Sequence, residues 1–134
     1  MKTALLLGAT VVCCTSCAPL NSSKSDLVGT WRVECEGGVE TIDLRADGRY
    51  VYTIESPRRR GRFEGTWEVE PRRERLESAR LILRHAPQSC ENATASGDPR
   101  VSDNTLAPVW EWGHVELSYH PDLGGFRRVQ KRAR

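Results

Sequence analysis

The residues of this chain with the clearest capacity for chemistry are its five cysteines. Cys13, Cys14 and Cys17 lie close together near the start, whereas Cys35 and Cys90 each stand alone. A cysteine thiol can carry a lipid, pair in a disulfide, bind a metal ion or act as a nucleophile, and the compartment of the protein restricts the choice. The segment that precedes Cys17 therefore has to be interpreted first.

The first residues have the composition of an export signal. Lys2 gives a positive start, residues 4–12 form an uncharged apolar run, and small residues follow at Thr15 and Ser16. The apolar run is too short to span a bilayer as a helix. We therefore expect residues 1–16 to be a signal peptide that directs export of the mature chain.

Cys17 and the polar residues after it resemble the lipobox and tether of bacterial lipoproteins, although Cys14 stands where that signal usually has Leu. The resemblance implies that Cys17 carries an acyl anchor of the palmitate type and that residues 17–26 form a flexible tether. Ala18, rather than Asp, follows the modified cysteine, which resembles the pattern of outer-membrane sorting. We therefore expect a cell-envelope lipoprotein on the periplasmic face of the outer membrane.

Export and acylation would leave Cys35 and Cys90 as one pair, because Cys13 and Cys14 leave with the signal peptide. An exported protein enters an oxidising compartment, so this pair predicts a disulfide. Two isolated cysteines are too few for a metal site. The sequence also identifies no basic partner that would activate a cysteine nucleophile.

The three histidines, His85, His114 and His120, lie in no metal-binding or catalytic-triad motif that we recognise. Glu111 and Glu116 flank one predicted strand without an evident partner that would raise the pKa of either carboxyl group. We therefore expect a protein that is not an enzyme and that has neither a metal site nor a cofactor.

Composition indicates one globular domain. The 134 residues are 38% hydrophobic and 28% charged, with a formal net charge of +2. The small net charge argues against a nucleic-acid partner. The basic residues are mostly arginines, which cluster in residues 58–62, 72–75 and 127–134. Such clusters are more often solubilising turns and tails than binding sites.

Alternating apolar residues predict strands in the mature chain. Asp47-Gly48 is a strong hairpin signal, and Pro57 ends the strand that follows it. The residues expected to face the core are Trp31, Val33, Cys35, Ile42, Leu44, Tyr50, Tyr52, Ile54, Phe63, Gly65, Trp67, Val69, Leu81 and Leu83. Residues 86–108, which are rich in Pro, Gly and Asn, predict one long loop.

Two further strands are expected, over residues 109–119 and 125–131. In the first of these strands, Trp110 and Trp112 have the opposite parity from Val115, Leu117 and Tyr119. We therefore expect a β-bulge at Gly113-His114, which would turn all five side chains towards the core. Seven strands without a convincing helix indicate an antiparallel barrel or a sandwich. A barrel is favoured because closure removes exposed edges.

A repeated motif narrows the fold. Gly29-Thr30-Trp31 recurs as Gly65-Thr66-Trp67, with Asp47-Gly48-Arg49-Tyr50 between the copies. This ordered set resembles the lipocalin-like domains of bacterial envelope proteins. The resemblance implies an all-β fold, a small antiparallel up-and-down barrel of about 7–8 strands, formed by residues 27–134 with a basic C-terminal tail.

The same resemblance assigns roles to four residues. In the lipocalin pattern the Trp of Gly-x-Trp plugs the closed end of the barrel, and an Arg of the last strand packs on its ring. It implies that Gly29 and Trp31 close one end here, with Arg127 or Arg128 over the indole.

Up-and-down topology alternates the chain between the two barrel ends. Trp31 and the tether would share one end, whereas Cys35, Cys90, the long loop and the basic C-terminus would share the other. The two cysteines would thus lie together, which supports the fold. A ligand or partner is expected at the rim of that second end. The residues predicted for this rim are Tyr50, Tyr52, Arg58, Arg59, Arg60, Trp67 and Trp110.

Two functions of different classes remain open. One is a membrane-anchored binder of a small apolar or amphiphilic molecule, whose anionic head would pair with the rim arginines. The other is a periplasmic inhibitor or adaptor that binds an envelope protein, similar to barrel-shaped inhibitors of lysozyme or proteases. The rim aromatics could equally be plain core, and a tethered component without a pocket is a third interpretation.

Overall fold

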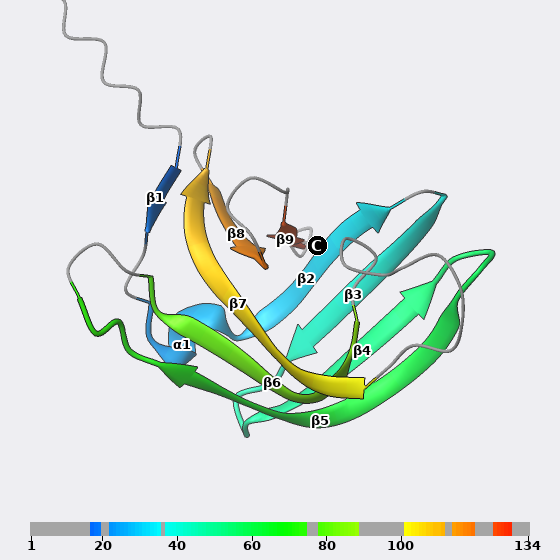
Figure 1. The fold of residues 1–134 in the computed structure, drawn as a ribbon, viewed down its shortest axis with the longest axis horizontal. Helices are drawn as coiled ribbons and strands as arrows, with labels where there is room; N and C mark the ends of the chain where they lie inside the picture. The colour runs from blue at the N-terminus through cyan, green and yellow to red at the C-terminus, as the bar shows by residue number, and fades with distance from the viewer. Residues whose placement is uncertain are drawn as a thin grey trace, which may run out of the picture.

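The structure is a computed structural model, and it describes residues 17–19, 22–35, 37–74, 78–88, 101–111, 114–119 and 125–129. Within these residues, strands account for nearly all of the regular structure, as Figure 1 shows. The elements in chain order are β1 (Cys17–Pro19), α1 (Lys24–Leu27), β2 (Gly29–Cys35), β3 (Gly38–Leu44), β4 (Arg49–Glu55), β5 (Arg60–Glu70), β6 (Arg80–Pro87), β7 (Val101–Glu111), β8 (His114–Ser118) and β9 (Phe126–Arg128).

The strands from β2 to β9 form a closed antiparallel barrel. Each pairs with the next along the chain, and β9 pairs with both β8 and β2, so the ring closes. The predicted all-β, up-and-down barrel is therefore confirmed. The sequence folds this way because apolar and polar residues alternate along the strands, which puts one set of side chains inside.

Large aromatic side chains occupy the barrel interior. Trp31, Tyr50, Tyr52 and Phe126 are each at most 1% exposed. The rings of Tyr52 and Phe126 meet edge to face, with centroids 6.1 Å apart. Small barrels are filled by their own side chains, and these residues contribute to the core rather than to an open wall.

The loop predicted over residues 86–108 is wrong at both ends. Ala86 and Pro87 belong to β6, and residues 101–108 belong to β7. Hydrogen bonds and ion pairs, rather than apolar alternation, stabilise this part of β7. Asp103 Oδ2 accepts a hydrogen bond from Arg84 Nη1 at 2.8 Å, and Asn104 Nδ2 donates to the Pro87 carbonyl at 2.8 Å. Because apolar residues do not alternate in this part of β7, the sequence pattern did not predict a strand there.

The single strand predicted over residues 109–119 is two strands. Glu111 of β7 pairs with His114 of β8, so the chain reverses direction between them and the predicted bulge near Gly113 is wrong. A hairpin also explains the change of parity, because the chain turns back on itself. One consequence is that β9 ends beside Trp31, at the end of the barrel opposite to the one predicted for the end of the last strand, while residues 130–134 lie outside the described residues.

A bulge does occur in β6, where the pairing with β7 shifts between Leu83 and Ala86. His85 in this bulge has a φ of 53°, the left-handed region that non-glycine residues rarely adopt. The Arg84 carbonyl accepts a hydrogen bond from Tyr50 Oη at 2.6 Å. The Tyr50 ring packs across Gly65, where an added Cβ would lie 2.5 Å from that carbonyl oxygen. The glycine is therefore required by close packing.

The segment predicted as a flexible tether contains regular structure. β1 pairs with the last residues of β7, and α1 follows after a capping box in which the Ser23 hydroxyl and backbone N–H donate to Asp26 Oδ2. The prediction of a flexible tether over residues 17–26 is therefore wrong for β1 and for the α1 residues within it. Within the described part of the chain, no helix has the length and hydropathy needed to cross a membrane.

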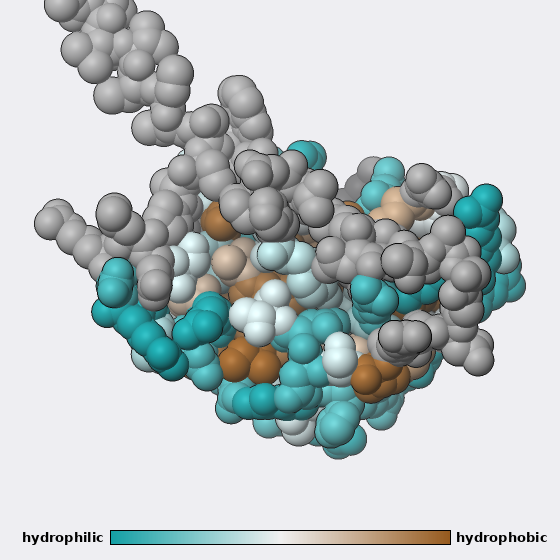
Figure 2. Space-filling view, viewed as in Figure 1, coloured by the Kyte–Doolittle hydropathy of each residue, from teal (hydrophilic) through white to brown (hydrophobic). Residues whose placement is uncertain are grey.

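Two ends of the barrel can be distinguished in Figure 1. On the left, α1 lies where β2 begins and β5 ends, and on the right the β2–β3 and β4–β5 turns lie together. We call these the α1 end and the Arg59 end. Figure 2 shows hydrophilic residues at the right edge and the lower left edge of the visible face, with hydrophobic residues between them.

Candidate functional site

Trp31 closes the α1 end, as predicted. Its side chain is fully buried, and its Nε1 donates a hydrogen bond to the Leu27 carbonyl at 2.9 Å. The Arg128 guanidinium lies 4.7 Å from the centroid of the indole ring and also donates to the Asp26 carbonyl. The expected contact between an Arg of the last strand and Trp31 is confirmed for Arg128. Gly29, with a φ of 141°, begins the strand that carries Trp31.

The second copy of the motif repeats this arrangement at the same end. Trp67 is 2% exposed, and its Nε1 donates to the Arg45 carbonyl at 2.9 Å. Lys24 Nζ of α1 lies 5.0 Å from the centroid of the Trp67 ring. Each tryptophan thus has one carbonyl partner and one cation over its face, and α1 contributes to both sets of contacts.

A pocket of about 640 Å³ lies beside α1 at this end. Its apolar lining comes from Leu27 and Val115, and Arg127, Arg128 and His114 add cationic or titratable groups. The described residues that line it are Ser22, Asp26, Leu27, His114, Val115, Arg127 and Arg128. The volume is in the range of small-molecule sites.

Arg127 has a different role from Arg128. Its Nε donates to Glu116 Oε1 at 2.8 Å, and His114 Nε2 lies 2.7 Å from the same oxygen. The Glu116 side chain is only 3% exposed, whereas that of Arg127 is 68% exposed. A buried carboxylate therefore holds Arg127 and His114 beside each other at the pocket.

Asp26 completes the lining next to Arg128. Hydrogen bonds from the Ser23 backbone and hydroxyl, together with the Arg128 charge, lower the pKa of the Asp26 carboxyl group. Asp26 is consequently ionised at neutral pH. The pocket lining thus contains two guanidinium groups and one carboxylate that Ser23 already engages, and Arg127 is also paired through its Nε with the Glu116 carboxylate.

The Arg59 end contains a buried charged group that the sequence analysis missed. Glu40 is 2% exposed, and Tyr52 Oη donates to its Oε2 at 2.6 Å. Arg59 Nη1 lies 3.6 Å from Glu40 Oε1, while its Nη2 donates to the Gln88 carbonyl. Glu40 shares the parity of Ile42 and was therefore recognisable as a carboxylate on the core face of a strand.

The residues predicted to form one rim do not lie together. Tyr50 and Trp67 are buried near the α1 end, and Tyr52 is in the interior. Trp110, which is 40% exposed, is the second-last residue of β7. Only Arg58, Arg59 and Arg60 lie at the Arg59 end. The aromatic part of the predicted rim is wrong. Tyr50 is the second residue of β4, which starts at the α1 end, so Tyr50 lies at the opposite end of the barrel from Arg58, Arg59 and Arg60.

Of the three rim arginines, only Arg59 turns inward. Its side chain is 15% exposed, whereas Arg58 and Arg60 are exposed. The β4–β5 turn fixes Arg59, since Ser56 N donates to the Arg59 carbonyl at 2.9 Å and the Arg59 N–H donates to Ser56 Oγ at 3.0 Å.

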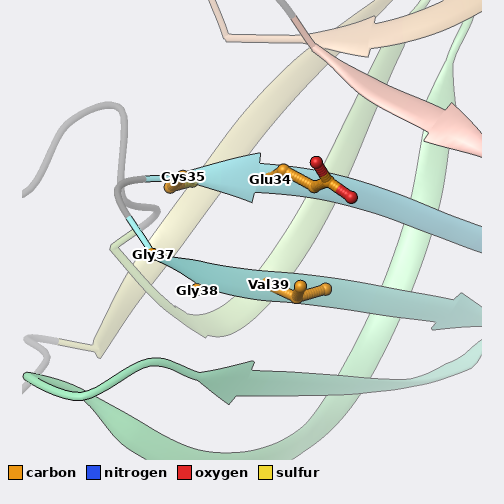
Figure 3. A pocket seen from close by; sticks show the side chains of 5 residues that line it. All are labelled: Glu34, Cys35, Gly37, Gly38 and Val39. Carbon is orange, nitrogen blue, oxygen red and sulfur yellow. The ribbon is translucent and has the colours of Figure 1, made fainter.

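A shallow hollow of about 400 Å³ lies at the tip of the β2–β3 hairpin. Figure 3 shows Glu34 and Val39, a cross-strand pair, with Cys35 and two glycines at the turn. The predicted partner of Cys35, Cys90, lies outside the described residues. The Cys35–Cys90 disulfide therefore stays a prediction.

Among the described residues, no three His, Cys, Asp or Glu side chains converge in a way that could hold a metal ion. Compared with protein-family models, curated proteins and solved structures, the chain shows no match. The barrel is thus established by its strand pairing alone, and the lipocalin-like identity stays a prediction.

Proposed function

We propose that the protein is an exported, lipid-anchored envelope protein that binds a small anionic amphiphile in the pocket beside α1. The composition of that pocket carries the proposal: Leu27 and Val115 offer apolar surface, and Arg127 and Arg128 offer guanidinium groups at the same opening. Guanidinium pairs with carboxylate or phosphate through two parallel hydrogen bonds, and apolar walls hold a hydrocarbon tail.

The proposal moves the binding site from the Arg59 end to the α1 end. The ligand chemistry expected from the sequence, an anionic head with an apolar tail, is retained. The change follows from the burial of Tyr50, Tyr52 and Trp67 in the core, so these three predicted wall residues do not form a binding wall with Arg58 and Arg60.

Native mass spectrometry of the protein purified from its own envelope tests this function. A retained small mass is expected, and we expect Arg127→Ser to weaken its binding about tenfold, which corresponds to about 1.4 kcal/mol. Arg58→Ser is the matched control, because Arg58 is exposed at the other end. A ligand lost equally from both variants would contradict the pocket assignment, and an intact mass without an acyl group on Cys17 would contradict the anchor.

A protein-binding inhibitor or adaptor is the second candidate. The packing of aromatic side chains into the interior supports it, since a filled barrel has to bind at its surface. Retention of a protein instead of a small mass in the same experiment would favour this candidate. Loss of that protein in Arg58→Ser with Arg60→Ser would place the contact at the Arg59 end.

A further inference from the structure

The position of β1 fixes where an anchor on Cys17 would lie. Cys17 pairs with Glu111, Ala18 with Trp110 and Pro19 with Val109. These partners are the last three residues of β7, on the edge that β6 has already left. β1 is thus paired to the last part of β7 at the α1 end, and Figure 1 shows the two strands side by side.

Exposed apolar side chains gather at the same end. Within the described residues, the large hydrophobic side chains that are exposed are Val101, Trp110 and Val129. Trp110, 40% exposed, lies between Ala18 and Val115 in the sheet, and Val129, 44% exposed, follows β9 directly. The Val129 N–H donates to the Thr30 carbonyl at 2.8 Å, which holds this residue at the opening. Val101 begins β7 at the Arg59 end.

Basic side chains lie at the same end of the barrel as these two apolar residues. Lys24 lies on α1, Arg127 and Arg128 lie on β9, and exposed Arg72 and Arg73 lie in the β5–β6 connection. Acidic side chains also lie at this end: Asp26 and Asp47 accept hydrogen bonds from Ser23 and from the Arg49 backbone, Glu70 and Glu116 pair with Arg80 and Arg127, and Glu74 is exposed beside Arg73. An exposed Trp at the same end as several exposed Arg and Lys side chains is an arrangement that suits the headgroup region of an anionic membrane.

We infer that the α1 end is a membrane-docking surface, which lies against an anionic bilayer with Trp110 and Val129 at the headgroup level and the basic residues among the phosphates. The inference rests on the proposed anchor at Cys17 for its orientation, but the surface is defined by its own residues. A contact of this kind adds electrostatic and apolar attraction to that of the anchor and sets how the barrel lies on the membrane.

Flotation of the unacylated protein with vesicles tests the surface by itself. The Cys17→Ser protein, secreted to the periplasm and purified, is mixed with vesicles of phosphatidylcholine alone or of phosphatidylcholine with phosphatidylglycerol. We expect binding to the anionic vesicles only, weakened by added salt. Trp110→Ser and Val129→Ser should each reduce that binding, the first by about tenfold.

Val101→Ser is the matched control, because Val101 is the comparably exposed valine of the opposite end. Unchanged binding in this control together with losses in the other two variants supports the docking surface. No binding by the Cys17→Ser protein, or equal binding by all variants, overturns it. Failure of the anchor is a separate result: an unmodified Cys17 in the envelope-purified protein would remove the anchor and leave the vesicle measurement valid.

Discussion

The two ends of the barrel are closed by different chemistry. At the α1 end, Trp31 and Trp67 each have a cation over the ring and a carbonyl at Nε1. At the Arg59 end, the buried Glu40 carboxylate is held by Tyr52 and Arg59. An aromatic closure is stabilised mainly by buried area, whereas a charged closure depends on every partner being present, because an uncompensated buried charge is costly.

Trp31→Ala should give the largest effect. The substitution removes a fully buried indole and leaves a cavity, so the free energy of unfolding should fall by about 3–5 kcal/mol. Urea unfolding followed by circular dichroism measures the loss. Trp110→Ala is the matched control, since Trp110 is partly exposed and should lose much less. Equal losses in the two variants would mean that burial at the α1 end is not what closes it.

Arg59→Leu should have the next largest effect. The substitution leaves the Glu40 carboxylate without its cation, and a loss of about 1–3 kcal/mol in the free energy of unfolding is expected because Arg59 is partly solvent-accessible. Arg60→Leu, at an exposed neighbouring position, should change stability by no more than about 0.5 kcal/mol.

Glu40→Gln sharpens this test through a double-mutant cycle. In the Gln background the charge is absent, so Arg59→Leu should cost less than in the wild type. Additive losses in the double variant would show that Glu40 and Arg59 do not interact, and the Arg59 end would then resemble the α1 end in its dependence on packing alone.

Arg128→Ala and Lys24→Ala compare the two tryptophan contacts. Loss of a cation over the ring should cost about 0.5–2 kcal/mol for Arg128, which also donates to the Asp26 carbonyl, and about 0.5–1 kcal/mol for exposed Lys24. Thermal unfolding at low and moderate salt would measure both. A larger loss of stability for Lys24→Ala than for Arg128→Ala would contradict the expectation that the additional hydrogen bond of Arg128 makes its contact the stronger one.

Alkaline pH should destabilise the protein through its buried phenols. Burial, aided by the Asp103 charge, raises the pKa of Tyr50 from 10.0 to about 12. The unfolded chain therefore releases this proton near pH 10 while the folded chain keeps it, so the free energy of unfolding falls as the pH rises from 10 to about 12. Tyr50→Phe should make the decline shallower. An unchanged slope in that variant would mean that Tyr50 makes no contribution to it.

Most of the barrel could be predicted from the sequence, because period-two alternation decides which face of a strand is buried. Tyr50, Tyr52, Trp67 and Leu81 all lie on the core face, as alternation predicts. The first part of β7, residues 101–108, could not be predicted, since Asp103 and Asn104 are satisfied by Arg84 and by the Pro87 carbonyl from a different strand. Long-range partners of this kind leave no local pattern.

The pocket beside α1 was harder to predict than the fold. Its position depends on the direction of β9, and one unrecognised hairpin at Glu111 and His114 reverses that direction. A single turn therefore decides at which end of the barrel Arg127 and Arg128 lie. Glu40, by contrast, had a local signal in its parity with Ile42, and a carboxylate on a core face implies a partner inside the fold.

The pairing of β1 with β7 also has a mechanical consequence. A force that pulls Cys17 away from the barrel acts first on a ladder of three residue pairs, before it reaches α1 or the closed ring. Such a short ladder opens before the barrel does, and each released residue lengthens the segment between Cys17 and the barrel by at most about 3.5 Å. With Cys17 anchored as we propose, tension would therefore open this ladder and lengthen the connection to the membrane while the barrel stays intact.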